Sequence, residues 1–440
     1  MLETFRNAFK IKDIRQRIFY TLLMLVLVRL GSQLPLPGVN SELITNWFAN
    51  QDADALNFFD AITGGSFEQM SVFALNITPY ITSSIIMQLL TIAIPKLEEM
   101  QKEGEDGRKK IMEITRYVTV ALALIQSVAM AIGFGRNGYL ETYDALHVIQ
   151  MVAGLTAGSA VLMWIGERIQ EKGVGNGISI VLTINIISRI PEDMMTLYTK
   201  FIENASNVGN AMIAAVVILA VIIVTVVFVI ILQDGQRRIP VQYSKKIQGR
   251  KQVGGQSSHI PLKVNTAGVI PVIFAQSIMQ FPVVIATILG NGTNGSGIGS
   301  KILRGLSQSN WCDPEQPIYS IGLLVYIVLI IAFAYFYTSI TFNPLEIANN
   351  MKRQGGFIPG IRPGKPTSDY LTKILNYIIF IGAAGLMIVA VIPIFFNGVF
   401  SADVSFGGTS IIIIVGVIIE TLKQIESQML VRYYKGFLND

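Results

Sequence analysis

Charged residues are scarce in this sequence, since only 14% of its 440 residues are Asp, Glu, Lys or Arg, against about 25% in a typical soluble domain. Hydrophobic residues make up 51% of the chain. A water-soluble fold could not bury that much apolar surface, because the buried fraction of a protein grows only slowly with its length. The composition therefore predicts an integral membrane protein, in which lipid covers the apolar excess.

Side chains that bind metal are scarcer still. The single cysteine, Cys312, cannot form a disulfide within the chain, and the two histidines, His147 and His259, lie far apart in the sequence. A Cys/His metal site needs several such ligands at short spacings. We therefore expect no metal site.

Motifs for catalysis are missing as well. The sequence contains no GxxxxGK[ST], HExxH or GxSxG motif, which are patterns of nucleotide hydrolysis, zinc proteases and serine hydrolases. The stretch GFGRNG (133–138) fits GxGxxG, but it ends an apolar run instead of joining a strand to a helix, so we interpret it as a chance match. We expect neither an enzyme nor a protein that binds a cofactor.

Long apolar runs dominate what is present. A helix needs about 20 mostly apolar residues to cross a bilayer, and the sequence predicts ten such spans. The first is expected to remain in the protein, because Pro35 and Pro37 follow it instead of a small-residue cleavage site. The predicted spans cover residues 18–34, 73–94, 117–135, 148–166, 176–190, 211–232, 267–290, 318–340, 371–396 and 406–424.

The basic residues predict how the spans are oriented. With the N-terminus in the cytoplasm, 28 of the 34 Lys and Arg residues fall at the cytoplasmic ends or in the cytoplasmic segments, as the positive-inside rule requires. An even number of spans then places both termini in the cytoplasm. The outer segment 291–316 is rich in Gly, Ser and Asn at its start and is expected to be a surface loop.

The spans divide into two groups of five. Residues 1–190 would form an N-terminal half, 191–209 an external hinge, 210–425 a C-terminal half and 426–440 a cytoplasmic tail. Because each half has an odd number of spans, the two halves would enter the membrane in opposite directions, an arrangement that builds sites at mid-membrane between the halves. Ten spans without such symmetry remain the alternative.

Three spans carry unusually many polar residues, namely 73–94, 176–190 and 267–290. Polar groups are costly in lipid, so these helices should face one another or a water-filled cavity. Segment 57–70, between the first two spans, is partly apolar but too short to cross. From its pattern alone, a re-entrant segment buried in protein and an amphipathic surface helix fit equally well.

Composition and spans alone do not define the function. One candidate is a secondary transporter with inverted repeats. Ion-coupled transporters usually carry acidic or similar groups at mid-membrane depth. Glu420 is the only acid deep in a predicted span, and it lies toward a cytoplasmic end. The sequence therefore disfavours the transporter.

Several stretches resemble the SecY family of channel subunits from the bacterial protein-export machinery, in the family's order and spacing and over nearly the whole chain. The most specific are the HIPLKVN and FIPGIRPG stretches. The stretches are ALNITPYITSSIIMQLL (74–90), RKKIMEITRY (108–117), GNGISI (175–180), GQRRIPVQYSKKIQGRK (235–251), SSHIPLKVNTAGVIPVIFAQSI (257–278), FNPLEIANNMKRQGGFIPGIRPG (342–364) and FGGTS (406–410).

The resemblance implies an all-α integral membrane protein of ten transmembrane helices, in two inverted five-helix halves around a central pore. It implies a channel in the bacterial plasma membrane that conducts unfolded secretory chains and releases hydrophobic segments sideways into lipid. The implied partners are the SecE and SecG subunits, the SecA motor ATPase, the ribosome, signal peptides and nascent secretory or membrane proteins.

The resemblance also implies roles for individual residues. Segment 57–70 would be a short plug helix, and the second and seventh spans would border a lateral gate. The pore ring would consist of Ile77, Ile81, Ile178, Leu182, Ile273 and Ile413. The plug would include Phe58, Phe59, Ile62, Gly64 and Gly65, and the gate Thr82, Ser83, Ser84, Gln88 and Gln276. Motor or ribosome binding would involve Arg250, Lys251 and Arg362.

Overall fold

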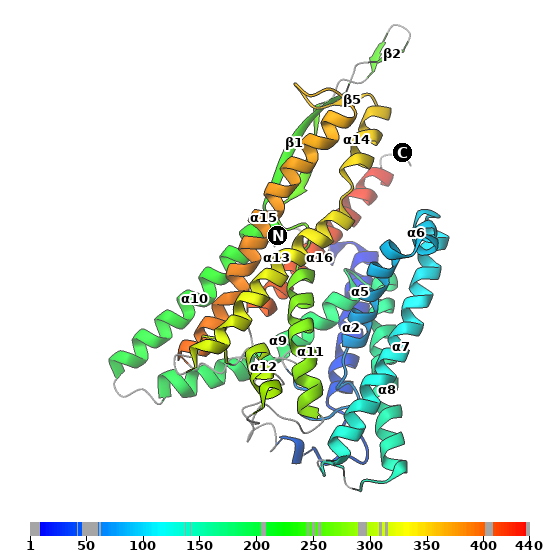
Figure 1. Cartoon of the computed structure of the whole chain (residues 1–440). Helices are drawn as coiled ribbons and strands as arrows, with labels where there is room; N and C mark the ends of the chain where they lie inside the picture. Colours follow the sequence, from blue (N-terminus) through cyan, green and yellow to red (C-terminus); the bar gives the residue numbers. More distant parts are fainter. Residues whose placement is uncertain are drawn as a thin grey trace. The chain divides into compact units, whose positions relative to one another are not determined.

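The computed structural model of the chain is mostly helical (Figure 1). Side chains are described for most but not all of the residues in these ranges. The residues that the structure describes are 9–41, 43–45, 60, 63–136, 138–140, 142–203, 208–243, 246–248, 251–253, 257–288, 297–307, 310–312, 316–400 and 408–436.

Apolar helices account for most of the described residues. The α-helices are α2 (Lys12–Ser32), α5 (Thr78–Ala93), α6 (Pro95–Lys102), α7 (Glu105–Arg136), α8 (Ala145–Lys172), α9 (Gly177–Leu197), α10 (Val208–Asp234), α11 (Ile270–Ile288), α12 (Ile298–Leu306), α13 (Ile321–Thr341), α14 (Pro344–Arg353), α15 (Lys365–Phe400) and α16 (Gly408–Gly436). A π-helix, η1 (Tyr198–Glu203), follows α9, and a 3-10 helix, η3 (Pro317–Ser320), precedes α13.

Each predicted span overlaps one of these helices, but not all of the helices could cross a membrane by length and composition. Among the described residues five helices meet that test, and a sixth does if α5 and α6 count as one span bent by 101°. Several apolar spans are therefore present, whereas the count of ten stays a prediction. The five are Glu105–Arg136, Ala145–Lys172, Met212–Asp234, Pro317–Arg353 and Lys365–Phe395.

The bend between α5 and α6 has a local cause. Pro95 is the first residue of α6, and Ile94 before it is extended, with φ −110° and ψ 111°. A residue that precedes proline avoids the helical region because the proline ring crowds its backbone. The helix therefore ends at Ala93, and a new one starts in a different direction.

The chain divides into two compact units. Unit 1 comprises residues 1–196, 282–307 and 420–440, and unit 2 comprises residues 197–281 and 308–419. The first change of unit, after Thr196, falls inside the predicted hinge 191–209. The inverted orientation of the two five-span halves, 1–190 and 210–425, remains a prediction.

Unit 1 is built on neighbouring helices α2, α5, α7 and α8, and Figure 1 shows α7 running alongside α8. Ser83 Oγ on α5 donates a hydrogen bond to the Thr115 carbonyl oxygen on α7, at 2.8 Å. Arg116 Nε on α7 donates to Glu167 Oε1 on α8, at 2.7 Å. These contacts hold α7 between its two neighbours.

Both ends of the described chain contact one turn of unit 1, the turn between α8 and α9. Arg17 Nη1 on α2 donates to the Gly173 carbonyl oxygen at 3.3 Å, and the Val174 amide donates to Thr21 Oγ1 at 3.1 Å. Ile425 of α16 packs into the same hydrophobic cluster as Val174 and the start of α2. Helices α2 and α16 thus meet around this turn.

Unit 2 combines helices with the strands of the chain. α13 lies alongside α15, and α14 also packs on α15 (Figure 1). β1 (Gln236–Tyr243) pairs antiparallel with β4 (Ser257–Lys263) on one side and with β5 (Gly356–Phe357) on the other. A separate hairpin joins β2 (Lys246–Gln248) to β3 (Lys251–Val253).

Two segments between the predicted spans contain regular structure. Ile239 and Val241 of β1 are buried, and with Leu262 of β4 they pack against α15 in one cluster. The described parts of the basic segment 234–266 thus include a strand pair that packs on α15. The predicted surface loop 291–316 contains the nine-residue helix α12.

Candidate functional site

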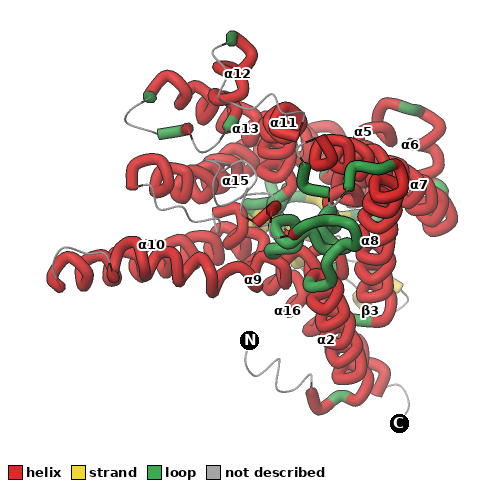
Figure 2. The backbone as a smooth tube through the Cα atoms, turned by 90° about the horizontal axis from the view of Figure 1, so that it is seen from below, coloured by secondary structure: helices red, strands yellow, loops and turns green. Residues whose placement is uncertain are grey.

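A mostly buried, largely non-helical segment lies between α2 and α5 in unit 1. We call it the insert and define it as Asp60 with residues 63–77. The Leu36 amide donates to the Met70 carbonyl oxygen and the Val72 amide donates to the Leu34 carbonyl oxygen, each at 3.0 Å. Figure 2 shows green loop segments beside α2 and α8. The insert is therefore not an exposed surface helix.

The insert fits closely against α8 and α9. A Cβ added at Gly158 of α8 would lie 1.9 Å from the Val72 carbonyl oxygen, and one added at Gly64 would lie 2.7 Å from the Asn185 carbonyl oxygen of α9. Gly64 also has a φ of +69°, in the left-handed region that glycine adopts without penalty. Glycine is required at both positions because backbone meets backbone there.

Two other residues of the insert have left-handed backbone. Met70 has φ 44° and Asn76 has φ 51°, and both side chains are fully buried. Asparagine tolerates this conformation because its short amide can bond locally, whereas for methionine it costs about 1–3 kcal/mol. The packing of Met70 in the hydrophobic core of unit 1 offsets that strain.

Four of the six predicted ring residues belong to one hydrophobic cluster in unit 1. Ile77 and Leu182 are buried, and Ile81 and Ile178 are half-buried. Ile77 and Ile81, like Ile178 and Leu182, are four residues apart, so each pair shares one face of its helical turn. Ile273 and Ile413 belong to unit 2, so the ring as a whole stays a prediction.

The start of α9 sets the position of its two ring residues. Asn176 Oδ1 accepts hydrogen bonds from the amides of Ile178 and Ser179, at 3.2 and 3.4 Å. Asparagine at this position satisfies amides that have no partner within the first turn of a helix. The GNG sequence therefore ends the turn after α8 and starts α9 at a defined residue.

Two buried asparagines join the insert to α9. Asn185 Nδ2 donates to Asn76 Oδ1 at 3.1 Å, although the two residues are 109 positions apart in the sequence. The polar residues of the predicted spans 73–94 and 176–190 were expected to face each other or a cavity. This pair does the former, because a buried amide needs a hydrogen-bond partner.

A network of charged residues lies next to the asparagines. Arg189 Nη1 of α9 lies 2.5 Å from Asp60 Oδ2, 3.0 Å from Glu68 Oε2 and 3.5 Å from Glu192 Oε2. The Asp60 side chain is 1% exposed, that of Arg189 14% and that of Glu68 26%. Arg29 Nη1 of α2 donates to the Gly64 carbonyl oxygen at 3.3 Å. Charges of two helices thus converge on the insert.

Burial raises the pKa of Asp60 in the insert to about 6. Arg189 and the hydrogen bond from the Glu68 amide favour the charged carboxylate and offset part of this effect. Above about pH 6 the carboxylate is therefore charged and paired with Arg189. Because the pKa of packed Asp60 lies above its ordinary value, the packed insert takes up a proton as the pH falls through about 6.

The predicted gate residues have different surroundings. Ser83 is buried and its hydroxyl bonds to α7, whereas Ser84 and Thr82 are half-buried and Gln88 is exposed on α5. Gln276 is buried on α11 in unit 2. Their assignment to one gate stays a prediction.

Of the predicted partner-binding residues, only Arg362 has a described side chain, and it is exposed. Gly360 and Gly364 on either side have φ of +81° and +106°, and Thr367 Oγ1 donates to the Arg362 carbonyl oxygen at 2.8 Å. The side chain thus projects from a constrained turn. Arg250 lies outside the described residues, and so do the predicted plug residues Phe58, Phe59 and Ile62, while Lys251 is described only as part of β3.

The sequence model of the SecY family matches residues 71–422. This chain belongs to the SecY family. A protein translocase subunit SecY from Halalkalibacterium halodurans is 43% identical over 100% of both chains, and one from Bacillus subtilis is 41% identical over 100% of both.

Solved structures share the fold of this SecY-family chain. One, described as a study of the plug domain that stabilises the closed state of the SecY channel and maintains a membrane seal, has a TM-score of 0.67 at 17% identity and covers 95% of this chain and 93% of its own. Another, Sec61 in a canine ribosome–channel complex, has a TM-score of 0.63 at 16% identity, with coverage of 95% and 93%. This chain is a multi-pass membrane protein with a mostly helical channel fold, and its relatives do not favour a secondary transporter.

Sequence reasoning missed the contacts among Asp60, Glu68 and Arg189. The sequence did contain a signal, because Arg29 and Arg189 are basic residues within or at the end of predicted spans. A charge at such a position needs a partner or water. Acidic residues in the adjoining segment 57–70 were the available partners.

Proposed function

We propose that this chain is a protein-conducting channel that passes unfolded secretory proteins across the bacterial plasma membrane and releases transmembrane segments sideways into lipid. The observation that carries the proposal is the cluster of the aliphatic side chains Ile77, Ile81, Ile178 and Leu182, where the buried insert meets α5 and α9, in a member of the SecY family. The channel is passive, and partners or the membrane potential supply the energy.

The aliphatic side chains would act as a collar. A narrow apolar constriction disfavours water and ions by dewetting, and its side chains can move aside for a passing polypeptide. An acidic or basic ring would instead bind ions and conduct them. Ile273 and Ile413 of unit 2 complete the proposed ring.

The insert supports a plug. Gly64 and Gly65 lie in it beside α9, and its burial suits a segment that closes a passage from within the protein. A SecY relative is described as having a plug domain that stabilises the closed state and maintains a seal. Residues 57–70 form the proposed plug of this chain.

The proposed lateral gate lies between α5 and α11. Polar contacts between membrane helices are worth only about 0.6–2 kcal/mol each. In the proposed gate, Ser84 and Gln88 on α5 and Gln276 on α11 would supply such contacts, which would close the gate in the resting state and yield to an apolar signal segment. Thr82 and Ser83 extend this polar stretch of α5.

The proposed topology has ten spans in two inverted halves with both termini in the cytoplasm. SecE and SecG would complete the complex, and the SecA motor and the ribosome would bind the cytoplasmic loops. A relative has been solved as part of a ribosome–channel complex. Basic residues of segment 234–266 and of the next cytoplasmic loop, including Arg250 and Lys251, suit ribosomal RNA phosphates or acidic protein surface.

A secretory chain stalled in transit should crosslink to a photoreactive residue at Ile81 and to one at Ile273, because both positions line the proposed passage. The matched control places the same probe at Ile223, an exposed residue on the apolar surface of α10. Crosslinking of the stalled chain, resolved by gel electrophoresis, measures the difference. Equal yields at Ile81, Ile273 and Ile223 would contradict the proposed channel.

Replacing Arg362→Glu should lower motor-driven export by about fivefold or more, because a like charge facing an acidic partner surface is repelled. The side chain is exposed, so folding should be unaffected. Export into inverted vesicles with SecA and ATP measures the effect. Lys301→Glu, on the proposed outer side, is the control with the same charge change, and export equal to that of the parent in Arg362→Glu would argue against this binding site.

A further inference from the structure

Arg189 forms the ion pairs that join α9 to the insert. Its Nη1 atom contacts a carboxylate of Asp60 and one of Glu68, both in the insert, and a third of Glu192 on its own helix. Glu68 and Arg189 are 121 positions apart in the sequence. The contacts therefore hold a tertiary arrangement rather than a local one.

Asp60 contacts both the insert itself and α9. Its Oδ1 atom accepts a hydrogen bond from the Glu68 amide at 2.8 Å, while Oδ2 faces Arg189. One carboxylate thus closes the insert on itself and attaches it to α9. With 1% exposure, it has almost no access to water.

The backbone at Gly64 and Gly65 lies between two basic side chains. Arg29 of α2 donates to the Gly64 carbonyl oxygen, and a Cβ at Gly65 would lie 3.5 Å from Arg189 Nη1. The backbone of Gly64 also contacts that of Asn185, one turn before Arg189 on α9. The outer end of α9 is therefore the surface on which this part of the insert rests.

We propose that Arg189 is a positioning residue that holds the proposed plug on α9 in the resting state through its ion pairs with Asp60 and Glu68. Displacement of the plug by a signal segment requires these pairs to separate. Their strength therefore sets how apolar a signal segment must be to open the channel. This inference rests on the proposed function of residues 57–70.

Removing one partner of a buried ion pair has a different effect from removing both partners. When one partner of a buried ion pair is removed, the other remains as an uncompensated charge, which destabilises the packed state strongly. Replacing both partners by neutral groups of similar size removes this penalty. A positioning role for Arg189 therefore predicts that a second substitution at Asp60 repairs the first.

The position of the insert can be measured by thiol labelling. Ser66 is buried in the insert, and Cys312 is the single cysteine of the chain, so Ser66→Cys in a Cys312→Ser background provides one defined thiol. A membrane-impermeant maleimide should label it slowly in the resting channel. With Arg189→Gln the labelling rate and the resting ion conductance should both rise by roughly tenfold or more.

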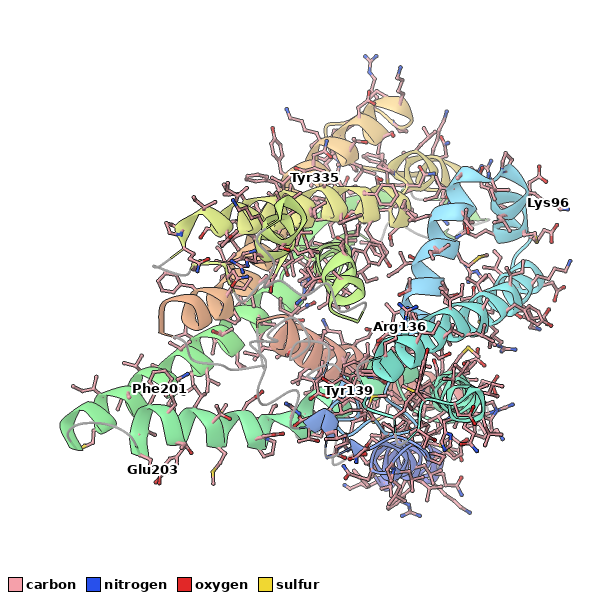
Figure 3. The ribbon with its side chains drawn as sticks, turned by 60° about the horizontal axis from the view of Figure 1, so that its bottom comes forward. Lys96, Arg136, Tyr139, Phe201, Glu203 and Tyr335 are labelled. Carbon is pink, nitrogen blue, oxygen red and sulfur yellow. The ribbon has the colours of Figure 1, made fainter. Side chains whose placement is uncertain are left out.

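Two further variants complete the test. Arg189→Gln with Asp60→Asn should return labelling and conductance to within about twofold of the parent, because the fully buried carboxylate is then neutral and the remaining partner, Glu68, is 26% exposed. Arg136→Gln, at the exposed outer end of α7, is the matched control and should change neither quantity; Figure 3 labels Arg136 at the end of α7 opposite the one beside Lys96.

The pH dependence of the single variant distinguishes positioning from general damage. The charged groups that face Asp60 are Arg189, Glu68 and Glu192, and Arg29 contacts the neighbouring backbone. Without Arg189, a packed Asp60 can be accommodated only when protonated, whereas a released Asp60 ionises freely. The conductance of Arg189→Gln should therefore fall toward that of the parent between about pH 8 and about pH 5.

Each outcome bears on the inference. Parent-like labelling in Arg189→Gln, or failure of Asp60→Asn to repair it, overturns the positioning role. If Arg189→Gln does not accumulate in the membrane, Glu68→Gln provides a second test, because it removes the more exposed of the two ion-pair partners in the insert at nearly constant volume. Labelling should still rise in Glu68→Gln, and parent-like labelling there would overturn the positioning role of Arg189. Raised labelling without raised conductance supports positioning by Arg189 and contradicts the plug, so the two failures are distinguishable.

Discussion

Replacing residues 57–66 with a Gly/Ser linker of equal length should make the resting channel leak ions, with a conductance in planar bilayers raised by about tenfold or more. These residues include most of the proposed plug, and without them only the aliphatic collar would oppose ion flow. The membrane potential drives each charge with about 2.3 kcal/mol per 100 mV. A collar wide enough to admit a polypeptide should not withstand that force alone.

The limits of the replacement follow from the packing of the insert. Phe67 and Met70 belong to the hydrophobic core of unit 1, and the Met70 carbonyl oxygen bonds to the Leu36 amide. Removing all of 57–70 would damage the fold and confuse leakage with instability. A Gly/Ser replacement of residues 291–296, in the predicted outer loop, is the control. If the variant with the linker at 57–66 had the same resting conductance as the parent, a sealing role for these residues would be excluded.

Replacing Gly158→Leu should largely abolish accumulation of the folded protein. A Cβ at this position would lie 1.9 Å from the carbonyl oxygen of Val72, and the insert behind it is held by α2 and α9, so it cannot move away cheaply. Such overpacking typically costs about 1–3 kcal/mol and more where backbone must shift, a large part of the stability of a typical domain. The amount of protein in the membrane and its thermal stability in detergent measure the effect.

Gly209→Leu is the matched control for this substitution. Gly209 also lies in a helix, α10, but a Cβ there would meet no atom within 4 Å. It should accumulate like the parent, since leucine favours a helix more than glycine does. Equal accumulation of the Gly158 and Gly209 variants would show that the insert can shift away from α8.

Helices were predictable from the sequence because each needs only a long local run of apolar residues. α10 and α13 lie where uncharged runs occur. The start of α5 was not predictable in the same way, because the predicted span began at Phe73 and the helix begins at Thr78. The left-handed backbone of Asn76 and the close contact of Val72 with α8 keep these residues out of the helix.

The strands of unit 2 had a weak signal in the sequence. In QRRIPVQY, Ile239 and Val241 alternate with exposed residues, which is the period of a half-buried strand. The run is short and lies in a basic segment, so its charge was the more prominent feature. The pairing of β1 with β5 joins residues more than 100 positions apart, and no local pattern specifies it.

The candidate site was partly predictable for the same reason. The aliphatic residues of the ring and the glycines of the insert follow from stretches that resemble the SecY family. The ion pairs of Arg189 and the bond between Asn76 and Asn185 depend on which distant residues meet. Composition shows only that such groups need partners, and the folded chain supplies them.

The turn between α8 and α9 has a consequence for biosynthesis. Ile425 of α16 shares a hydrophobic cluster with Val174 and with Ile14 and Ile18 of α2. Until α16 has been translated and inserted, this cluster lacks Ile425, and α2 remains without that packing partner. Final consolidation of unit 1 is thus expected only after α16 has been synthesised and inserted, and truncated chains that lack α16 would present an incomplete apolar surface to membrane quality-control proteases.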